Sequence, residues 1–174
     1  MQRPLILFSF ALAAVTLACG GDTTTPPVSK IITFKGDLRS SNENPVNSSQ
    51  GQGSFTITLD TSTNVLTWDV QVNGLTTNIN NGHIHGPAAA GVNAGVLLNF
   101  NPAASSGIPG STFTGFGSAT TGRAQGTLNL TTAVLTTTVN GDSLKKLLLA
   151  GQAYVNVHTT QNPGGEVRGQ IVKP

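Results

Sequence analysis

Apolar and polar residues alternate in short segments along most of the chain. Between residues 53 and 59, the apolar residues Phe55, Ile57 and Leu59 alternate with serine or threonine. Residues 65–72 repeat this alternation around Trp68. A period of two residues is typical of strands that bury one face. The two segments are therefore predicted to form the neighbouring strands of a hairpin.

Further strands are predicted wherever such segments lie between turn-forming residues. A single helical pattern occurs at residues 142–150, where Asp142 or Ser143 can cap the start and Gly151 can end the helix. Residues 101–117 are rich in Gly, Ser and Pro and are expected to be irregular. The other predicted strands are residues 31–38, 80–87, 95–100, 122–130, 134–139, 152–159 and 166–172.

About eight or nine short strands at this spacing predict an all-β fold with one short helix. The pattern is typical of an immunoglobulin-sized β-sandwich or a Greek-key domain. The apolar positions of the alternating segments should face the core. The core residues predicted in this way are Phe55, Ile57, Trp68, Val155, Val157, Val167 and Ile171.

Composition and charge agree with an all-β fold and argue against other classes. Charged residues make up only 9% of the chain, too few for helical bundles rich in Glu and Lys or for charge-driven disorder. The formal net charge is +2, and Lys145 and Lys146 are the only adjacent basic residues. A nucleic-acid-binding surface needs a basic stripe, often with aromatic residues, so we expect no nucleic-acid partner.

The first 18 residues have the pattern of an export signal. Arg3 precedes an apolar run from Leu5 to Leu17, which is shorter than the roughly 20 residues that span a bilayer but fits the core of a signal peptide. The string Leu17-Ala18-Cys19 resembles the bacterial lipobox, in which the cysteine receives a diacylglyceryl group and becomes the new N-terminus. Cleavage by an ordinary signal peptidase is the alternative, and it would leave an unpaired thiol.

Lipidation of Cys19 implies an exported protein of the cell envelope whose partner is the lipid bilayer. Gly20 differs from the Asp that tends to retain lipoproteins at an inner membrane, so the resemblance implies an outer-membrane anchor. The expected organisation is a signal peptide at residues 1–18, the lipidated cysteine with a flexible Thr/Pro/Gly tether at 19–30, and one β-sandwich domain at 31–173.

The last two predicted strands form a hairpin around residues 160–164, and alternation places polar side chains on one face of both strands. These side chains, which are expected to form a polar network, are Tyr154, Asn156, His158, Glu166, Arg168 and Gln170. A five-residue loop at 160–164 predicts the cross-strand pairs His158–Glu166, Asn156–Arg168, Val157–Val167 and Ala153–Ile171, and a slip of two residues is the alternative that keeps the same faces.

The three histidines of the chain fall in predicted strands. His83 and His85 share one face of residues 80–87, and His158 lies in the last hairpin. If these strands are neighbours, the three imidazoles suit zinc or copper, with Glu166 as a fourth ligand or as an orienting group. The alternative needs no metal: the same side chains form a polar face of His–Glu and Asn–Arg cross-strand pairs.

No set of residues in the sequence indicates catalysis. The single cysteine lies at the end of the leader, and no G-x-S-x-G string occurs. Copper–zinc superoxide dismutase also places an H-x-H string on a β-sandwich, but three histidines cannot supply its two metal sites. We therefore expect that the protein is not an enzyme.

Several strings together resemble the CHRD domain, the module named after chordin and common in bacterial exported proteins. The resemblance covers residues 31–173, and it implies an immunoglobulin-sized β-rich fold in which the strand of His83 lies beside the last hairpin. The bacterial members have no generally assigned activity, so the resemblance implies no reaction. The strings are residues 42–46, 51–55, 83–88, 147–151, 154–159 and 162–170.

These observations predict a membrane-tethered extracytoplasmic module for binding, adhesion or structure, without catalytic activity and without a cofactor. The alternative function is a metal-binding domain that holds zinc or copper on His83, His85 and His158, with Glu166 close by.

Overall fold

The computed structural model describes residues 30–103, 107–136 and 139–173. The predicted leader, Cys19 and the predicted tether up to residue 29 lie outside the described residues. The carbonyl of Lys30 accepts hydrogen bonds from the backbone N–H and the hydroxyl of Thr61, both at 3.0 Å. The chain is therefore attached to the rest of the domain from Lys30 onward.

Nine strands, one short α-helix and one turn of 3-10 helix make up the regular structure of the described residues, so the all-β prediction is confirmed. All neighbouring strands are antiparallel, and they form a single sheet in the order β5-β4-β8-β9-β1-β2-β3-β7-β6. The two separate sheets of a sandwich, and a Greek-key arrangement, are not confirmed. The strands are β1 Ile31–Arg39, β2 Gln52–Asp60, β3 Val65–Asn73, β4 Ile79–His85, β5 Val96–Asn99, β6 Thr112–Thr114, β7 Gly122–Asn129, β8 Ala153–Thr159 and β9 Val167–Ile171.

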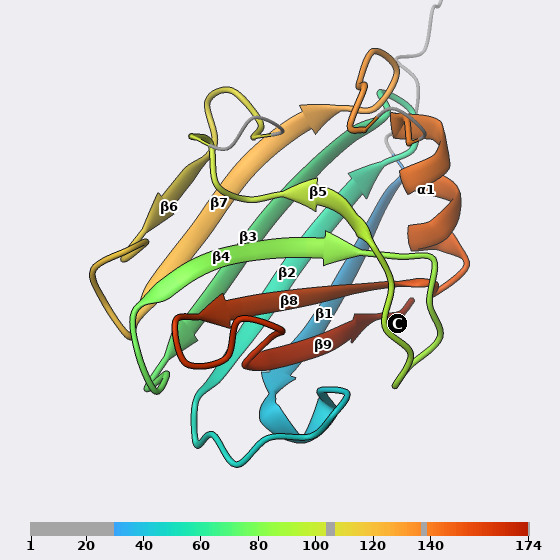
Figure 1. The fold of residues 1–174 in the computed structure, drawn as a ribbon. Helices are drawn as coiled ribbons and strands as arrows, with labels where there is room; N and C mark the ends of the chain where they lie inside the picture. The colour runs from blue at the N-terminus through green and yellow to red at the C-terminus, as the bar shows by residue number, and fades with distance from the viewer. Residues whose placement is uncertain (1–29, 104–106, 137–138, 174) are drawn as a thin grey trace, which may run out of the picture.

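The sheet curls over, so that its two halves enclose the core. In Figure 1, β4, β5, β8 and β9 pass in front of β1, β2, β3 and β7. The two halves meet where β1 pairs with β9 through Arg39 and Arg168. Side chains from both halves, among them Phe34, Trp68 and Val155, form one cluster, and every predicted core residue is buried.

The helix α1, Gly141–Leu149, forms where the sequence predicts it but has a different cap. The side-chain oxygen of Asn140 accepts a hydrogen bond from the backbone N–H of Ser143 at 2.9 Å, so Asn140 is the N-cap rather than Asp142 or Ser143. Gly151 follows the helix with a φ of 69°, the left-handed conformation that ends helices. Among the described residues, no helix is long and apolar enough to cross a membrane.

Two predictions about strands were wrong. The described part of residues 134–139 forms no strand, because the N–H of Leu135 bonds to the carbonyl of Val139 at 3.0 Å and turns the chain back, while Val134 is 83% exposed. The edge of β7 where residues 134–139 were expected pairs instead with β6, which lies inside the stretch 101–117 that was predicted to be irregular.

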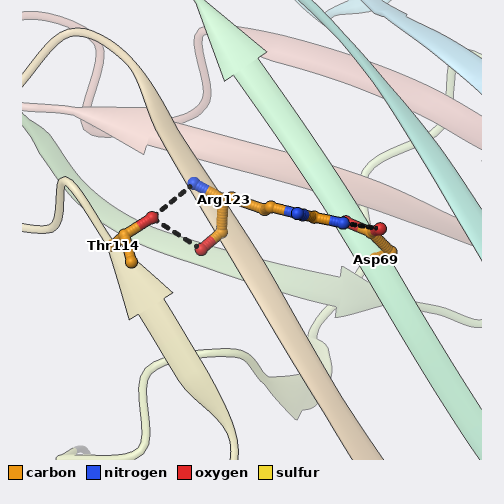
Figure 2. Close-up of polar contacts among 3 residues, drawn as sticks. All are labelled: Asp69, Thr114 and Arg123. Carbon is orange, nitrogen blue, oxygen red and sulfur yellow. Dashed lines mark hydrogen bonds and ion pairs between the residues drawn. The ribbon is translucent and has the colours of Figure 1, made fainter.

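Exposed polar contacts accompany the pairing of β6 with β7 (Figure 2). The backbone N–H of Arg123 donates to the Thr114 hydroxyl at 3.2 Å. The Arg123 guanidinium reaches the next strand, β3, and donates through both Nε and Nη2 to the carboxylate of Asp69. This hydrogen bonding lowers the pKa of Asp69, but solvent screens the exposed pair, so it adds little to stability.

Replacing Val157 with Asp should unfold the domain. Val157 is 1% exposed and pairs with Val167, so the change removes apolar burial and introduces a charge without a partner, a cost of about 4 kcal/mol or more. Val134→Asp at the 83% exposed position is the matched control and should keep the strand spectrum. Circular dichroism with urea unfolding measures both. A Val157→Asp variant as stable as the Val134→Asp variant would show that the core is assigned wrongly.

Candidate functional site

Strands β4 and β8 place the three histidines in one cluster. The strands are neighbours, with His83 paired to Asn156 and His85 paired to Tyr154. The imidazole centroids are 5.1 Å apart for His83 and His85, 4.9 Å for His83 and His158, and 5.7 Å for His85 and His158. We call these three residues the histidine cluster.

The cluster lies on the face of the sheet opposite the core. Val155 and Val157 point into the core, so alternation turns Tyr154, Asn156 and His158 to the other face. Each cluster histidine is nevertheless only 8% exposed. The structure therefore buries a layer of polar side chains outside the apolar core.

Hydrogen bonds to backbone carbonyls fix two of the imidazoles. His85 Nδ1 lies 3.0 Å from the carbonyl oxygen of Ala94, and His158 Nδ1 lies 3.0 Å from that of Pro163. A carbonyl can only accept, so each Nδ1 carries the proton and each Nε2 has a free lone pair. His158 Nε2 uses its lone pair to accept a hydrogen bond from His83 Nδ1 at 3.1 Å.

His85 Nε2 differs from the other nitrogens of the cluster. It is fully buried and has no hydrogen-bond partner among the described residues. Buried polar atoms without a protein partner are uncommon in native proteins, and a bound ion or water molecule is one way in which they are satisfied. The cluster thus contains an available nitrogen lone pair without a partner in the described part of the chain.

Burial keeps all three imidazoles neutral at physiological pH. Burial and the neighbouring histidines His158 and His85 lower the pKa of His83 to about 3. Burial also lowers the pKa of His85 to about 4, with Arg168 acting in the same direction against the bond to Ala94. The pKa of His158 is lowered by burial as well. Neutral imidazoles are the form that binds metal ions.

Tyr154 connects the cluster to a buried arginine. Its ring stacks on His85 with a centroid separation of 5.0 Å and an interplanar angle of 7°. The guanidinium carbon of Arg168 lies 3.4 Å from the centroid of the Tyr154 ring. Arg168 is 1% exposed and donates to the side-chain oxygen of Asn93 at 3.0 Å and the carbonyl of Val92 at 2.7 Å. A permanent positive charge therefore lies close to the histidine cluster.

Glu166 does not join the cluster, although the register predicted for the last hairpin is confirmed. The pairs Asn156–Arg168, Val157–Val167 and Ala153–Ile171 form as predicted. Glu166, however, precedes the first residue of β9, and its carboxylate extends toward Thr159 instead of His158. The groups that donate hydrogen bonds to it are the hydroxyls of Ser49, Thr76 and Thr159, the Asn162 amide and the Thr76 N–H.

These hydrogen bonds account for the ionisation of Glu166. Burial raises the pKa of its carboxyl, but the bonds from Ser49, Thr159 and Thr76 outweigh burial and hold the pKa below the usual value. Glu166 is therefore an ionised group that ties the 49–51 and 76 segments to β8. The part that it was predicted to play at a metal site does not agree with these contacts.

Glu43 is a buried acid that the sequence pattern does not identify as a site residue. Glu43 lies in a loop, so the alternation of strand residues gives no information about it. The sequence feature that could have pointed to Glu43 is the string at residues 42–46, which is part of the family resemblance. Glu43 is 6% exposed; the Asn156 amide donates to Oε2 at 3.4 Å, and Oε1 is buried without a partner among the described residues. Burial raises its pKa to about 7, although Arg168 and the bond from Asn156 act in the opposite direction.

Two surface grooves lie outside the histidine cluster, and only the smaller one borders the polar layer. The larger one, of about 790 Å³, is lined by threonines and other polar residues of β2, β3 and β7 and includes none of the cluster histidines. A smaller groove of about 580 Å³ lies beside the polar layer, between the loop of Glu43 and the loop of Ala90, with Arg168 and Gln170 in its lining. Neither groove contains the histidine cluster.

Comparison with known proteins gives one result. The family model of the CHRD domain matches residues 34–171, which include the histidine cluster, Glu43 and Arg168. Searches of curated proteins and of solved structures found no match to the chain.

Replacing Glu43 with Gln should stabilise the protein at pH 8 and much less at pH 5. The raised pKa of Glu43 means that its ionised form destabilises the fold above about pH 7, and this penalty disappears as the pH falls toward the ordinary value of 4.5. The expected gain at pH 8 is about 2 kcal/mol, measured by urea unfolding. Asp142→Asn, at a 77% exposed acid, is the control and should show no such difference. An equal effect of Glu43→Gln at both pH values would contradict this account.

Proposed function

The chain belongs to the CHRD domain family, and we propose that it is a membrane-tethered extracytoplasmic binding module whose ligand is a transition-metal ion, zinc or copper. The ligands of the ion are the imidazoles of His83, His85 and His158. The module holds the ion and does not catalyse a reaction, because the cluster lies in a buried layer that a substrate cannot approach directly.

One observation carries this proposal: ligand nitrogens of all three imidazoles lie within 4.8 Å of one another, and two rings are oriented by carbonyls as metal-binding histidines are. The 3.1 Å between His83 Nδ1 and His158 Nε2 suits two ligands of one ion, since bonds of about 2.0–2.1 Å place ligands about 3.3 Å apart. For His83 Nδ1 to bind the ion, the proton that it donates to His158 would move to His83 Nε2, so that the imidazole stays neutral.

A hydrogen-bonded network without a metal explains less of the geometry. Such a network satisfies His83 and His158 through their mutual hydrogen bond. It leaves the buried Nε2 of His85 without a partner, and that atom would lower the stability of the fold by about 1–3 kcal/mol. An ion bound to His85 removes this cost, as a buried water molecule would, and the ion also accounts for the approach of three imidazole nitrogens to within 4.8 Å, which favours the metal-binding function.

The tether in this proposal follows from the sequence. Residues 1–18 direct export, Cys19 becomes a lipidated N-terminus, and residues up to 30 link the anchor to the domain. Stable anchoring needs more than one acyl chain, which a triacylated cysteine provides. The cluster would then act at the surface of a membrane in the cell envelope, without nucleic-acid partners.

Replacing Cys19 with Ser should release the protein from the membrane. Without the thiol there is no acceptor for the lipid, so the variant should move from the membrane fraction to the soluble fraction and change its mobility on gels. Fractionation of cells that produce either protein measures this. If the Ser variant remains in the membrane fraction with unchanged mobility, the lipid anchor is wrong.

The metal-free protein should bind one equivalent of zinc or copper at pH 7.5, measured by competition with a chromophoric chelator. His85→Phe keeps a ring stacked on Tyr154 but removes the nitrogen, so binding should fall at least about 10-fold, because even the loss of an outer-shell partner of a ligand weakens metal binding by about 10- to 100-fold. Asp142→Asn controls for adventitious binding by exposed acids and should bind as the wild type does.

Wild-type protein that binds neither ion would contradict the proposal whatever the variants do. Equal affinity of the wild type and the His85→Phe variant would contradict it too, because the ion would then lie elsewhere.

A further inference from the structure

The donor atoms and the charges around the histidine cluster distinguish between ions. We infer that the cluster holds copper as Cu(I), in preference to the dications Zn(II) and Cu(II). This inference rests on the proposed metal-binding function and adds the identity and the charge of the ion.

The ligand set contains no negative charge. The group of described residues that could hold an ion consists of His83, His85 and His158, without a carboxylate or a thiolate. Glu166, the carboxylate that the sequence suggested as a fourth ligand, accepts hydrogen bonds from Ser49 and Thr76 with its two oxygens. Three neutral nitrogens leave the full charge of the ion in a buried layer, where the cost of desolvation rises steeply with charge. A monovalent ion is therefore favoured over a divalent one.

Arg168 increases this difference. Its guanidinium carbon lies 3.4 Å from the centroid of the Tyr154 ring, and that centroid lies 5.0 Å from the centroid of the His85 imidazole. The guanidinium therefore lies no farther from the His85 imidazole than these two distances added together. Arg168 is 1% exposed, so water screens its charge poorly. A bound ion lies about 3 Å beyond the imidazole centroid, so at a separation of about 8–11 Å and an effective dielectric constant of about 20, each additional unit of charge on the ion weakens binding by roughly 10- to 30-fold.

The buried acid Glu43 compensates this arginine incompletely. Glu43 interacts electrostatically with Arg168, but burial raises its pKa to about 7, so at neutral pH a large fraction of its carboxyl groups carries no charge. Part of the repulsion between Arg168 and a dication therefore persists at pH 7.5, where some of the Glu43 carboxyl groups are still protonated.

The number of available ligands points to the same ion. Zinc on three histidines takes a water molecule as its fourth ligand, so zinc needs room for that water beside imidazoles that are only 8% exposed. The Tyr154 hydroxyl already accepts a hydrogen bond from the N–H of Ala94 at 3.1 Å. Cu(I) has a filled d shell and is stable with three nitrogen ligands in a trigonal arrangement. Three imidazoles in a buried layer meet that requirement without a further group.

The test compares Cu(I) and Zn(II) on the full-length metal-free protein at pH 7.5. Cu(I) is titrated without oxygen against bicinchoninate, and Zn(II) is titrated against a chromophoric zinc chelator. The expected result is one equivalent of Cu(I) bound at least about 100-fold more tightly than Zn(II), from the combined effects of the missing fourth ligand and the added charge. Zn(II) bound as tightly as Cu(I), or more tightly, overturns the inference but leaves the proposed function intact. Binding of neither ion overturns both.

A pair of variants isolates the effect of the charge. Arg168→Lys keeps the positive charge, whereas Arg168→Met removes it from a side chain of similar length. Relative to Arg168→Lys, Arg168→Met should reduce the preference for Cu(I) over Zn(II) about 10-fold. Identical preferences in two folded variants would overturn the electrostatic part of the inference. If either variant fails to fold, the comparison of the two ions on the wild type still decides it.

Discussion

The burial of a layer of polar side chains on the outer face of β8 and β9 is the constraint on which the rest of the structure depends. A buried polar group without a partner destabilises a fold, so each group in this layer requires one. The loop at residues 86–95 supplies hydrogen-bond partners for three groups of the layer. Arg168 donates to Asn93 and Val92. Gln170 donates to the carbonyl of Ala88, and the Tyr154 hydroxyl accepts from the N–H of Ala94. The loop and the layer hold each other in place.

The histidine cluster takes its geometry from the same constraint. The carbonyl of Ala94 sets the tautomer of His85, and the carbonyl of Pro163 sets that of His158. Both carbonyls belong to loops that pack on the layer, so the loops determine which nitrogens keep a free lone pair. Burial under these loops also lowers the pKa of each imidazole and keeps the three rings neutral. The position of the loops and the protonation of the imidazoles are therefore coupled in this fold.

Alternation of apolar and polar residues predicts a large part of this arrangement, because it records which face of a strand meets the core. It identifies the strands that carry the histidines and the shared face of His83 and His85, whereas the register that pairs Asn156 with Arg168 follows from the length of the loop at 160–164. Alternation fails for residues that lie outside the paired part of a strand. Glu166 precedes the first residue of β9, so alternation predicts the wrong position for its carboxylate. The joining of two halves into one sheet depends on the pairing of β1 with β9, which are far apart in the sequence.

X-ray absorption by the copper-loaded protein tests whether the nitrogens of three imidazoles bind one ion. We expect three nitrogen neighbours at about 2.0 Å and the outer-shell scattering that imidazole rings produce. One or two imidazole neighbours, or a first shell made of oxygen, would contradict the proposal.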